Sequence, residues 1–282
     1  MSTDYRRMWT ELGMDLKAHD ALLDALNQGY RDIYLSQKNR PQGMRYFDFV
    51  LGQVHGQRIQ ELREEQQAGR KIIGSYCVFV PEEIVLAGNA TLVGLCSGAD
   101  FAMEEVEKVL PRNTLCDELE QRGKNKEGVR PQGTPRILMS GCPMAVPNWK
   151  MPHLVESAGG LIVGEESCVG ERGNRNLVDD SGQTVDELIE ALVNRYFQIE
   201  CAIFTPNPDR LERIKKMYSD SKADGVIHYS IQFCQPYIME SIPVEKALEA
   251  EGIPCLRVET DYSMEDAGQL STRIEAFLEV LR

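Results

Sequence analysis

Eight cysteines are the residues of this chain with the most distinctive chemistry. Thiolates are nucleophiles and soft ligands that bind zinc, copper(I) and iron–sulfur clusters. Most of the eight lie at or just past the end of a short apolar run, with Gly or Pro near several of them: Cys77, Cys96, Cys142, Cys168 and Cys234. Functional groups of α/β proteins gather where the strands end, so these positions favour a shared site.

The spacing of the cysteines narrows the kind of site. The chain has no C-x-x-C pair, which disfavours structural zinc, and no closely spaced ferredoxin run. Spacing alone therefore leaves two interpretations, a dispersed iron–sulfur site or several buried thiols. Cys201 and Cys255 lie within apolar runs, and we expect both in the core.

The elements that would position these cysteines follow from hydrophobic periodicity. Helical spacing over residues 4–28 and 43–68 predicts a helical N-terminal region. Short apolar runs predict strands at residues 71–80, 91–95, 136–140, 160–164, 202–205, 225–230 and 254–259. Helices are predicted at residues 101–109, 184–196, 209–219, 243–251 and 267–281. This alternation predicts an α/β fold of the Rossmann-like or flavodoxin-like kind.

The expected organisation is a helical region at residues 1–70 and two lobes with small parallel sheets flanked by helices. The first lobe takes residues 71–122 and the second residues 135–282. The polar, Gly-rich stretch at residues 123–134 is the expected linker between them.

Composition excludes several classes of function. The net charge of −13 argues against broad nucleic-acid binding, and no apolar run is long enough to span a membrane. The first ten residues lack the apolar core of a secretory signal. We therefore expect a cytoplasmic protein, a compartment in which eight cysteines are not a disulfide framework.

Several segments resemble a known family. Residues 76–84 (YCVFVPEEI) match its C-x-x-x-P-E-E-[IL] signature and are followed by Leu-Ala-Gly. Residues 110–116 (LPRNTLC) and 226–236 (VIHYSIQFCQP) are similar to its cluster-ligand segments. Residues 259–262 and 268–277 resemble its closing segment. The chain is identified on these motifs as resembling the 2-hydroxyacyl-CoA dehydratase and benzoyl-CoA reductase superfamily.

Two further segments resemble one branch of that superfamily, the double-cubane-cluster proteins. These are Ser140–Pro143 and Gly164–Glu171. The resemblance implies a reductase that passes low-potential electrons to a small, hard-to-reduce substrate. It implies a double-cubane 8Fe-9S cluster or a single 4Fe-4S cluster, an ATP-hydrolysing iron–sulfur activator protein as electron donor, and a homodimer with the cluster between its lobes. The implied ligands are Cys77, Cys116, Cys142, Cys168 and Cys234, with Cys96 a weaker sixth.

The chain departs from the family pattern in one respect. It contains no T-C-D-G segment, and Cys116 runs directly into residues 117–125, so the chain is internally shortened. Two alternatives therefore stay beside the double-cubane reductase. One is a single-cubane dehydratase or reductase subunit that acts on an acyl-CoA thioester, and the other is a non-catalytic shortened paralogue.

Three further residues are candidates for proton transfer. Glu82 and Glu83 follow Pro81, where they would either cap a helix or supply protons near the cluster. His228 lies in a predicted strand, and we favour a core histidine over a proton donor there. No Gly-rich phosphate loop is present, so we do not expect this chain to bind ATP itself.

Overall fold

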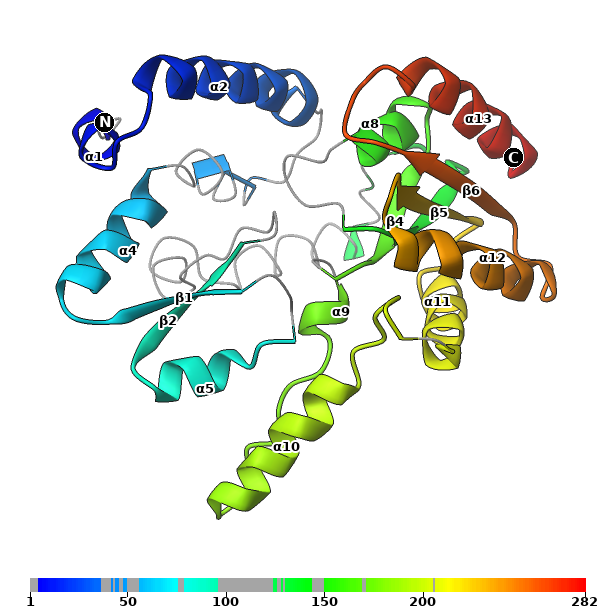
Figure 1. Ribbon diagram of the computed structural model, residues 1–282. Coiled ribbons are helices and arrows are strands. Elements are labelled where there is room, and N and C mark those ends of the chain that lie inside the picture. Colours follow the sequence, from blue (N-terminus) through cyan, green and yellow to red (C-terminus); the bar gives the residue numbers. More distant parts are fainter. Residues whose placement is uncertain are drawn as a thin grey trace. The chain divides into compact units, whose positions relative to one another are not determined.

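The structure is a computed structural model in which two compact units are distinguished. The first unit comprises Met1–Ser75, Glu82–Leu95 and Ala99–Val129, and the second comprises Tyr76–Pro81, Cys96–Gly98 and Arg130–Arg282. The residues that the structure describes are 5–36, 42, 44–45, 48–49, 56–75, 79–95, 124–125, 128, 130–143, 150–168, 171–204 and 206–282. Figure 1 shows the elements.

The first unit contains a small parallel sheet and several helices. The helices are α1 (Arg6–Glu11), α2 (Leu16–Gly29), the π-helical turn η1 (Tyr30–Leu35), α4 (Gln57–Gln67) and α5 (Glu82–Ala87). The strands β1 (Lys71–Ser75) and β2 (Ala90–Gly94) pair in parallel. The predicted helix at residues 4–28 is interrupted between α1 and α2, where Gly13 has a φ of +77°.

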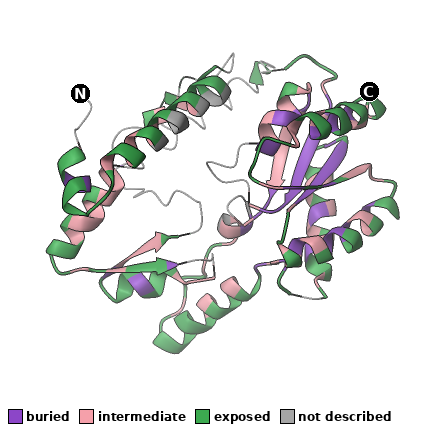
Figure 2. Ribbon diagram, turned by 45° about the horizontal axis from the view of Figure 1, so that its top comes forward, coloured by how far each residue is buried: buried purple, intermediate pink, exposed green. Residues whose placement is uncertain are grey.

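The second unit is built on a four-stranded parallel sheet. Its strands are β3 (Arg136–Gly141), β4 (Leu161–Glu166), β5 (Gly225–Ile231) and β6 (Cys255–Thr260), in the order β4-β3-β5-β6. The strands β3 and β5 are buried almost throughout, and Figure 2 shows them in purple. Their continuous apolar runs fit this burial, because helices cover both faces of a parallel sheet. The α/β fold expected from the sequence is confirmed.

Two helical layers enclose this sheet. The helices α8 (Lys150–Ser157) and α13 (Ala267–Val280) contribute to one core cluster with Met139 of β3, and α11 (Pro208–Asp220) and α12 (Gln235–Glu249) contribute to a second with Leu138. Adjacent residues of β3 thus enter opposite cores, as the two-residue period of a strand requires.

Two shorter stretches complete the second unit. The helix α9 (Glu171–Asn174) follows β4, and α10 (Val185–Phe197) begins with a capping box. In it the Glu187 N–H donates to the Thr184 hydroxyl, and the Thr184 N–H donates to the Glu187 carboxylate. No residue of α10 is buried, and Val185 and Phe197 are 71% and 83% exposed.

The predicted strand at residues 202–205 is wrong for its described residues. Residues 202–204 form a turn in which the Phe204 N–H donates to the Cys201 carbonyl at 3.0 Å. The predicted helix at residues 243–251 begins earlier, at Gln235, and Pro243 lies inside it. The predicted helix at residues 101–109 lies outside the described residues. Among the described residues, no helix is both long and apolar enough to cross a bilayer.

Candidate functional site

Three of the predicted ligands lie at one edge of the four-stranded sheet. Cys142 directly follows β3, Cys168 comes two residues after β4, and Cys234 comes three residues after β5. Because β4, β3 and β5 are neighbours and all parallel, their carboxyl ends meet at the same edge. The connection from β3 runs through α8 to β4, and the connection from β5 runs through α12 to β6 at the other end of the sheet, so β3 and β5 flank the point where the strand order reverses. Sheets of this topology bind ligands at that point.

The thiols of Cys142 and Cys234 are in direct contact. They share a hydrogen bond, and the Cys168 thiol is close enough to act electrostatically on Cys142. Cys142 is 1% exposed, and its sulfur accepts a hydrogen bond from the Ile231 N–H at 3.3 Å. Burial raises the pKa of Cys142. Cys234 stands at the N-cap of α12, where the helix dipole stabilises negative charge.

A glycine sets the position of Cys142. Gly141 has a φ of +128°, and a Cβ built there would lie 1.9 Å from the Tyr229 carbonyl oxygen. The Cys142 N–H donates to that same oxygen at 3.1 Å. A side chain at residue 141 would therefore push apart the two strands that carry Cys142 and Cys234.

Cys201 joins the site, although its apolar surroundings in the sequence predicted a core residue. Its thiol hydrogen-bonds with that of Cys168, which lowers the pKa of Cys168 and raises that of Cys201. The run Ile-Glu-Cys-Ala-Ile-Phe predicted a buried strand, so nothing in the sequence indicated that Cys201 lies beside the other thiols. We call Cys142, Cys168, Cys201 and Cys234 the thiol cluster.

Cys168 has two polar neighbours besides Cys201. The Tyr237 hydroxyl lies 3.4 Å from the Cys168 sulfur, and Nη1 of Arg172 lies 3.6 Å from it. The same Nη1 donates to the Tyr237 hydroxyl at 2.9 Å. Arg172 and Tyr237 are both buried. Their donors therefore meet at the Cys168 sulfur.

Arg172 belongs to a buried network of ion pairs. Glu166, at the end of β4, pairs with Arg172 and also with Arg210, at 3.0 Å from Nη2 of Arg210. Arg210 pairs in addition with Glu240, and the Ser140 hydroxyl donates to Glu166 at 2.8 Å. Burial opposes ionisation of Glu166, but Arg210 and Arg172 outweigh it and hold its pKa below the ordinary value. Two guanidinium groups and two carboxylates thus balance in charge.

The three residues proposed for proton transfer all lie in the described part of the chain, His228 in the second unit and Glu82 and Glu83 in the first. His228 is fully buried in β5, with Nδ1 at 3.2 Å from the Ser140 hydroxyl. Burial, aided by the charge of Arg210, lowers the pKa of His228 to about 3, so its imidazole is neutral at neutral pH. Glu82 and Glu83 are exposed in the first turn of α5, in the first unit. A catalytic role for these three remains a prediction.

The remaining cysteines divide into two groups. Cys77, Cys96 and Cys116 lie outside the described residues. Cys255 begins β6 and so lies at the amino edge of the sheet, opposite the thiol cluster. The Phe79 ring, two residues after Cys77, makes an edge contact with Phe204 at 5.8 Å. Phe79 therefore lies beside the turn that follows Cys201.

The family of the chain follows from comparison with known proteins. Residues 113–281, more than half of the chain, match the family model described as 2-hydroxyglutaryl-CoA dehydratase, D-component. The chain belongs to this dehydratase family. The match confirms the superfamily that the sequence motifs predicted, and it covers all four members of the thiol cluster.

Three relatives of this dehydratase-family chain are informative. It is 34% identical over 185 residues to YjiM of Escherichia coli K12, which is described as a candidate dehydratase subunit. The aligned residues make up 65% of the chain and 47% of YjiM. It is 34% identical to the beta subunit of (R)-phenyllactyl-CoA dehydratase from Clostridium sporogenes, covering 43% of the chain and 31% of the relative. The beta subunit of (R)-2-hydroxyglutaryl-CoA dehydratase from Acidaminococcus fermentans is 29% identical, with 43% and 33% covered. The chain spans less than half the length of each relative.

The thiol cluster of this family member fits an iron–sulfur cofactor in two respects. Its donors are soft thiol sulfurs, which bind iron as thiolates, and Nε of Arg172 is buried with no hydrogen-bond partner among the described residues. Within those residues, no three Cys, His, Asp or Glu side chains converge on the position of a single metal ion. In a cluster, each thiolate binds a different iron, so its ligands need not converge on one point.

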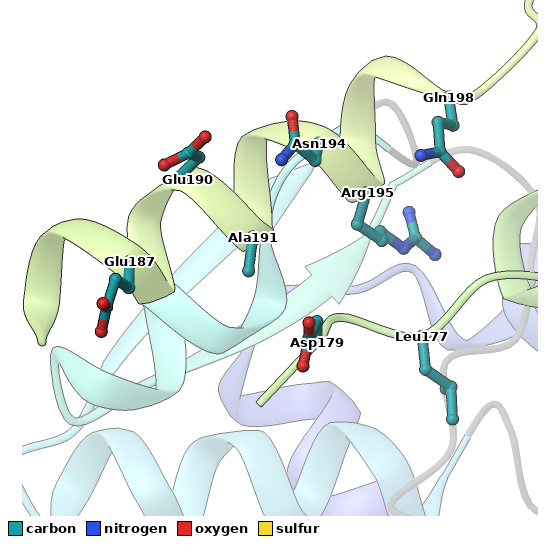
Figure 3. A pocket seen from close by; sticks show the side chains of 8 residues that line it. All are labelled: Leu177, Asp179, Glu187, Glu190, Ala191, Asn194, Arg195 and Gln198. Atoms are coloured by element: carbon teal, nitrogen blue, oxygen red, sulfur yellow. The ribbon is translucent and has the colours of Figure 1, made fainter. Parts of the chain in front are cut away.

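One surface cavity of the dehydratase-family chain lies apart from the thiols. Its volume is about 380 Å³, and it lies between α10 and the segment with Leu177 and Asp179. Figure 3 shows the side chains that line it. No cysteine lines it, and its Glu187 is already engaged in the capping box of α10. The thiol cluster, rather than this cavity, is therefore the candidate site.

Proposed function

We propose that this chain is an iron–sulfur reductase of the 2-hydroxyacyl-CoA dehydratase superfamily, in its double-cubane-cluster branch. It transfers low-potential electrons to a small, hard-to-reduce substrate and receives them from an ATP-hydrolysing iron–sulfur activator protein. The observation that carries the proposal is the thiol cluster at the carboxyl edge of β4, β3 and β5. We also propose that the protein is a cytoplasmic homodimer with the two-lobe division expected from its sequence.

The proposed ligands from the second unit are Cys142, Cys168 and Cys234, with Cys77 and Cys116 contributing from segments outside the described residues. A bound cluster would supply a centre that accepts and delivers single electrons at low potential. The chain contributes the rest. It buries Cys142, places Cys234 at a helix N-terminus and directs the donors of Arg172 and Tyr237 at Cys168.

A second candidate is a single-cubane subunit that acts on an acyl-CoA thioester with a partner subunit. The names of two relatives favour it, because both are beta subunits of acyl-CoA dehydratases. In this case one 4Fe-4S cluster would use three of the predicted cysteines. The internal shortening of the chain also favours the smaller cofactor.

Iron and sulfide analysis of the anaerobically purified protein separates these functions. About eight irons per chain support the double cubane, and about four support the single cubane. A chain that binds no iron, even after anaerobic reconstitution with iron and sulfide, is the non-catalytic paralogue, and the proposed function is then wrong. Visible absorption that fades on reduction provides a second readout, because thiolate-bound iron–sulfur clusters are coloured.

A further inference from the structure

Arg172 occupies an unusual position for a charged residue. Its side chain is 1% exposed, and two of its three nitrogens are engaged, Nη2 with Glu166 and Nη1 with Tyr237 and Cys168. The third, Nε, has no partner among the described residues. Arg172 is therefore held between a carboxylate on one side and the Cys168 sulfur on the other.

The two donors at Cys168 are therefore Nη1 of Arg172 and the Tyr237 hydroxyl, while Nη2 of Arg172 stays bonded to Glu166. An anionic sulfur-rich group held by Cys168 would accept from these same two donors. Hydrogen bonds to ligand and cluster sulfur stabilise the more negative, reduced state, so they raise the reduction potential.

We propose that Arg172 and Tyr237 are positioning residues that donate hydrogen bonds to the sulfur atoms at Cys168 and thereby raise the reduction potential of the bound cluster. This inference rests on the proposed function. It assigns a role to a residue that the family signature motifs do not include. Lysine would be a poor replacement, because only a guanidinium fork reaches Glu166 and Cys168 at the same time.

The structure also explains how the charge of Arg172 is held in place. Glu166 binds Arg172 on one side and Arg210 on the other, and Arg210 is bound in turn by Glu240. The four charges balance before any thiolate is counted. The guanidinium is therefore fixed and does not need Cys168 to be ionised, which leaves Nη1 directed at the Cys168 sulfur.

The test compares anaerobically reconstituted wild type with Arg172→Gln, Arg172→Lys and Tyr237→Phe. Tyr218→Phe is the matched control, because it loses the same hydroxyl in the other core cluster, away from the thiols. Iron per chain is measured first, and then the ratio of reduced to oxidised cluster at one fixed potential. We expect a ratio about tenfold lower in Arg172→Gln, about threefold lower in Tyr237→Phe and intermediate in Arg172→Lys. Tyr218→Phe should match wild type.

The outcomes separate this inference from the proposed function. Wild type that binds no iron overturns the proposed function, and this inference with it. Variants that hold iron at the wild-type level but change the ratio less than twofold overturn this inference alone. If Arg172→Gln fails to fold, Tyr237→Phe decides, because it removes one hydroxyl and no charge.

Discussion

Arg210 and Glu166 form an ion pair of 3.0 Å in which the side chains are 0% and 3% exposed. They come from α11 and β4, so the pair joins a helix to the strand that precedes Cys168. Burying two charges is tolerated because each has a second partner, Glu240 for Arg210 and Arg172 for Glu166. The network therefore ties β4 and α9, which lie on either side of Cys168 in the sequence, to α11 and α12 of one helical layer.

Glu166→Gln should be strongly destabilising. The substitution leaves Arg172 uncompensated and Arg210 with Glu240 alone, and breaking a buried ion network costs about 3–5 kcal/mol. Denaturant unfolding of the metal-free protein measures the effect. The matched control is Glu212→Gln, whose carboxylate pairs with Lys215 at an exposed position and should cost about 1 kcal/mol or less. Equal losses in both variants would contradict the buried network.

His228 should make the protein less stable as the pH falls. Its folded-state pKa of about 3 is below the ordinary value of 6.5, so between these values the unfolded chain binds the extra proton. The stability from His228 is complete above pH 6.5 and is lost as the pH falls toward 3. We expect the unfolding free energy of wild type, relative to His228→Gln, to drop by about 2 kcal/mol from pH 7 to pH 5. A constant difference would show that His228 protonates in the folded protein.

Gly141→Ala should disrupt the site. The new Cβ would overlap the Tyr229 carbonyl oxygen, in addition to the cost of a positive φ. Gly133→Ala isolates the second cost, because Gly133 has a φ of +86° and open space around it. We expect about 1–2 kcal/mol for Gly133→Ala and at least about 3 kcal/mol for Gly141→Ala, by denaturant unfolding. Similar losses would mean that β3 and β5 can separate at little cost.

The predicted ligands should differ from Cys255 in iron binding. Cys116→Ala and Cys234→Ala should each lower bound iron by more than about half, because loss of a thiolate weakens the cluster. Cys255→Ala should leave iron unchanged, because Cys255 lies at the opposite edge of the sheet. Iron analysis after identical anaerobic reconstitution provides the comparison. Equal loss in all three would show that the assignment is wrong.

Cys201 should behave as a member of the site. Because its thiol hydrogen-bonds with Cys168, Cys201→Ala should speed the removal of iron by a chelator about tenfold or more. The loss of absorbance with time measures this, with Cys255→Ala as the control. If the two variants lose iron at the same rate, Cys201 is a core residue, as its sequence context predicted.

The strands and the cysteines at their ends could be predicted because each depends on a few adjacent residues. An apolar run followed by Gly-Cys-Pro indicates both β3 and the place of Cys142. The charged partners could not be predicted in this way, since Glu166 and Arg210 are far apart in the chain and meet only through tertiary packing. Cys201 was missed because its apolar neighbours favour a strand as much as a turn. Pro243 is a typical first residue of a helix, yet α12 begins eight residues earlier.

The strand order β4-β3-β5-β6 determines when the thiol cluster can exist during biosynthesis. Cys142 and Cys234 come together only once β5, the third strand of this sheet to be synthesised, has paired with β3. A nascent chain that ends before Cys234 holds Cys142 without its partner thiol. Parallel pairing also needs the whole intervening crossover to be in place, which makes it a late event in folding. A cofactor that needs Cys142 and Cys234 together would therefore bind only after translation has passed Cys234 and β5 has paired with β3.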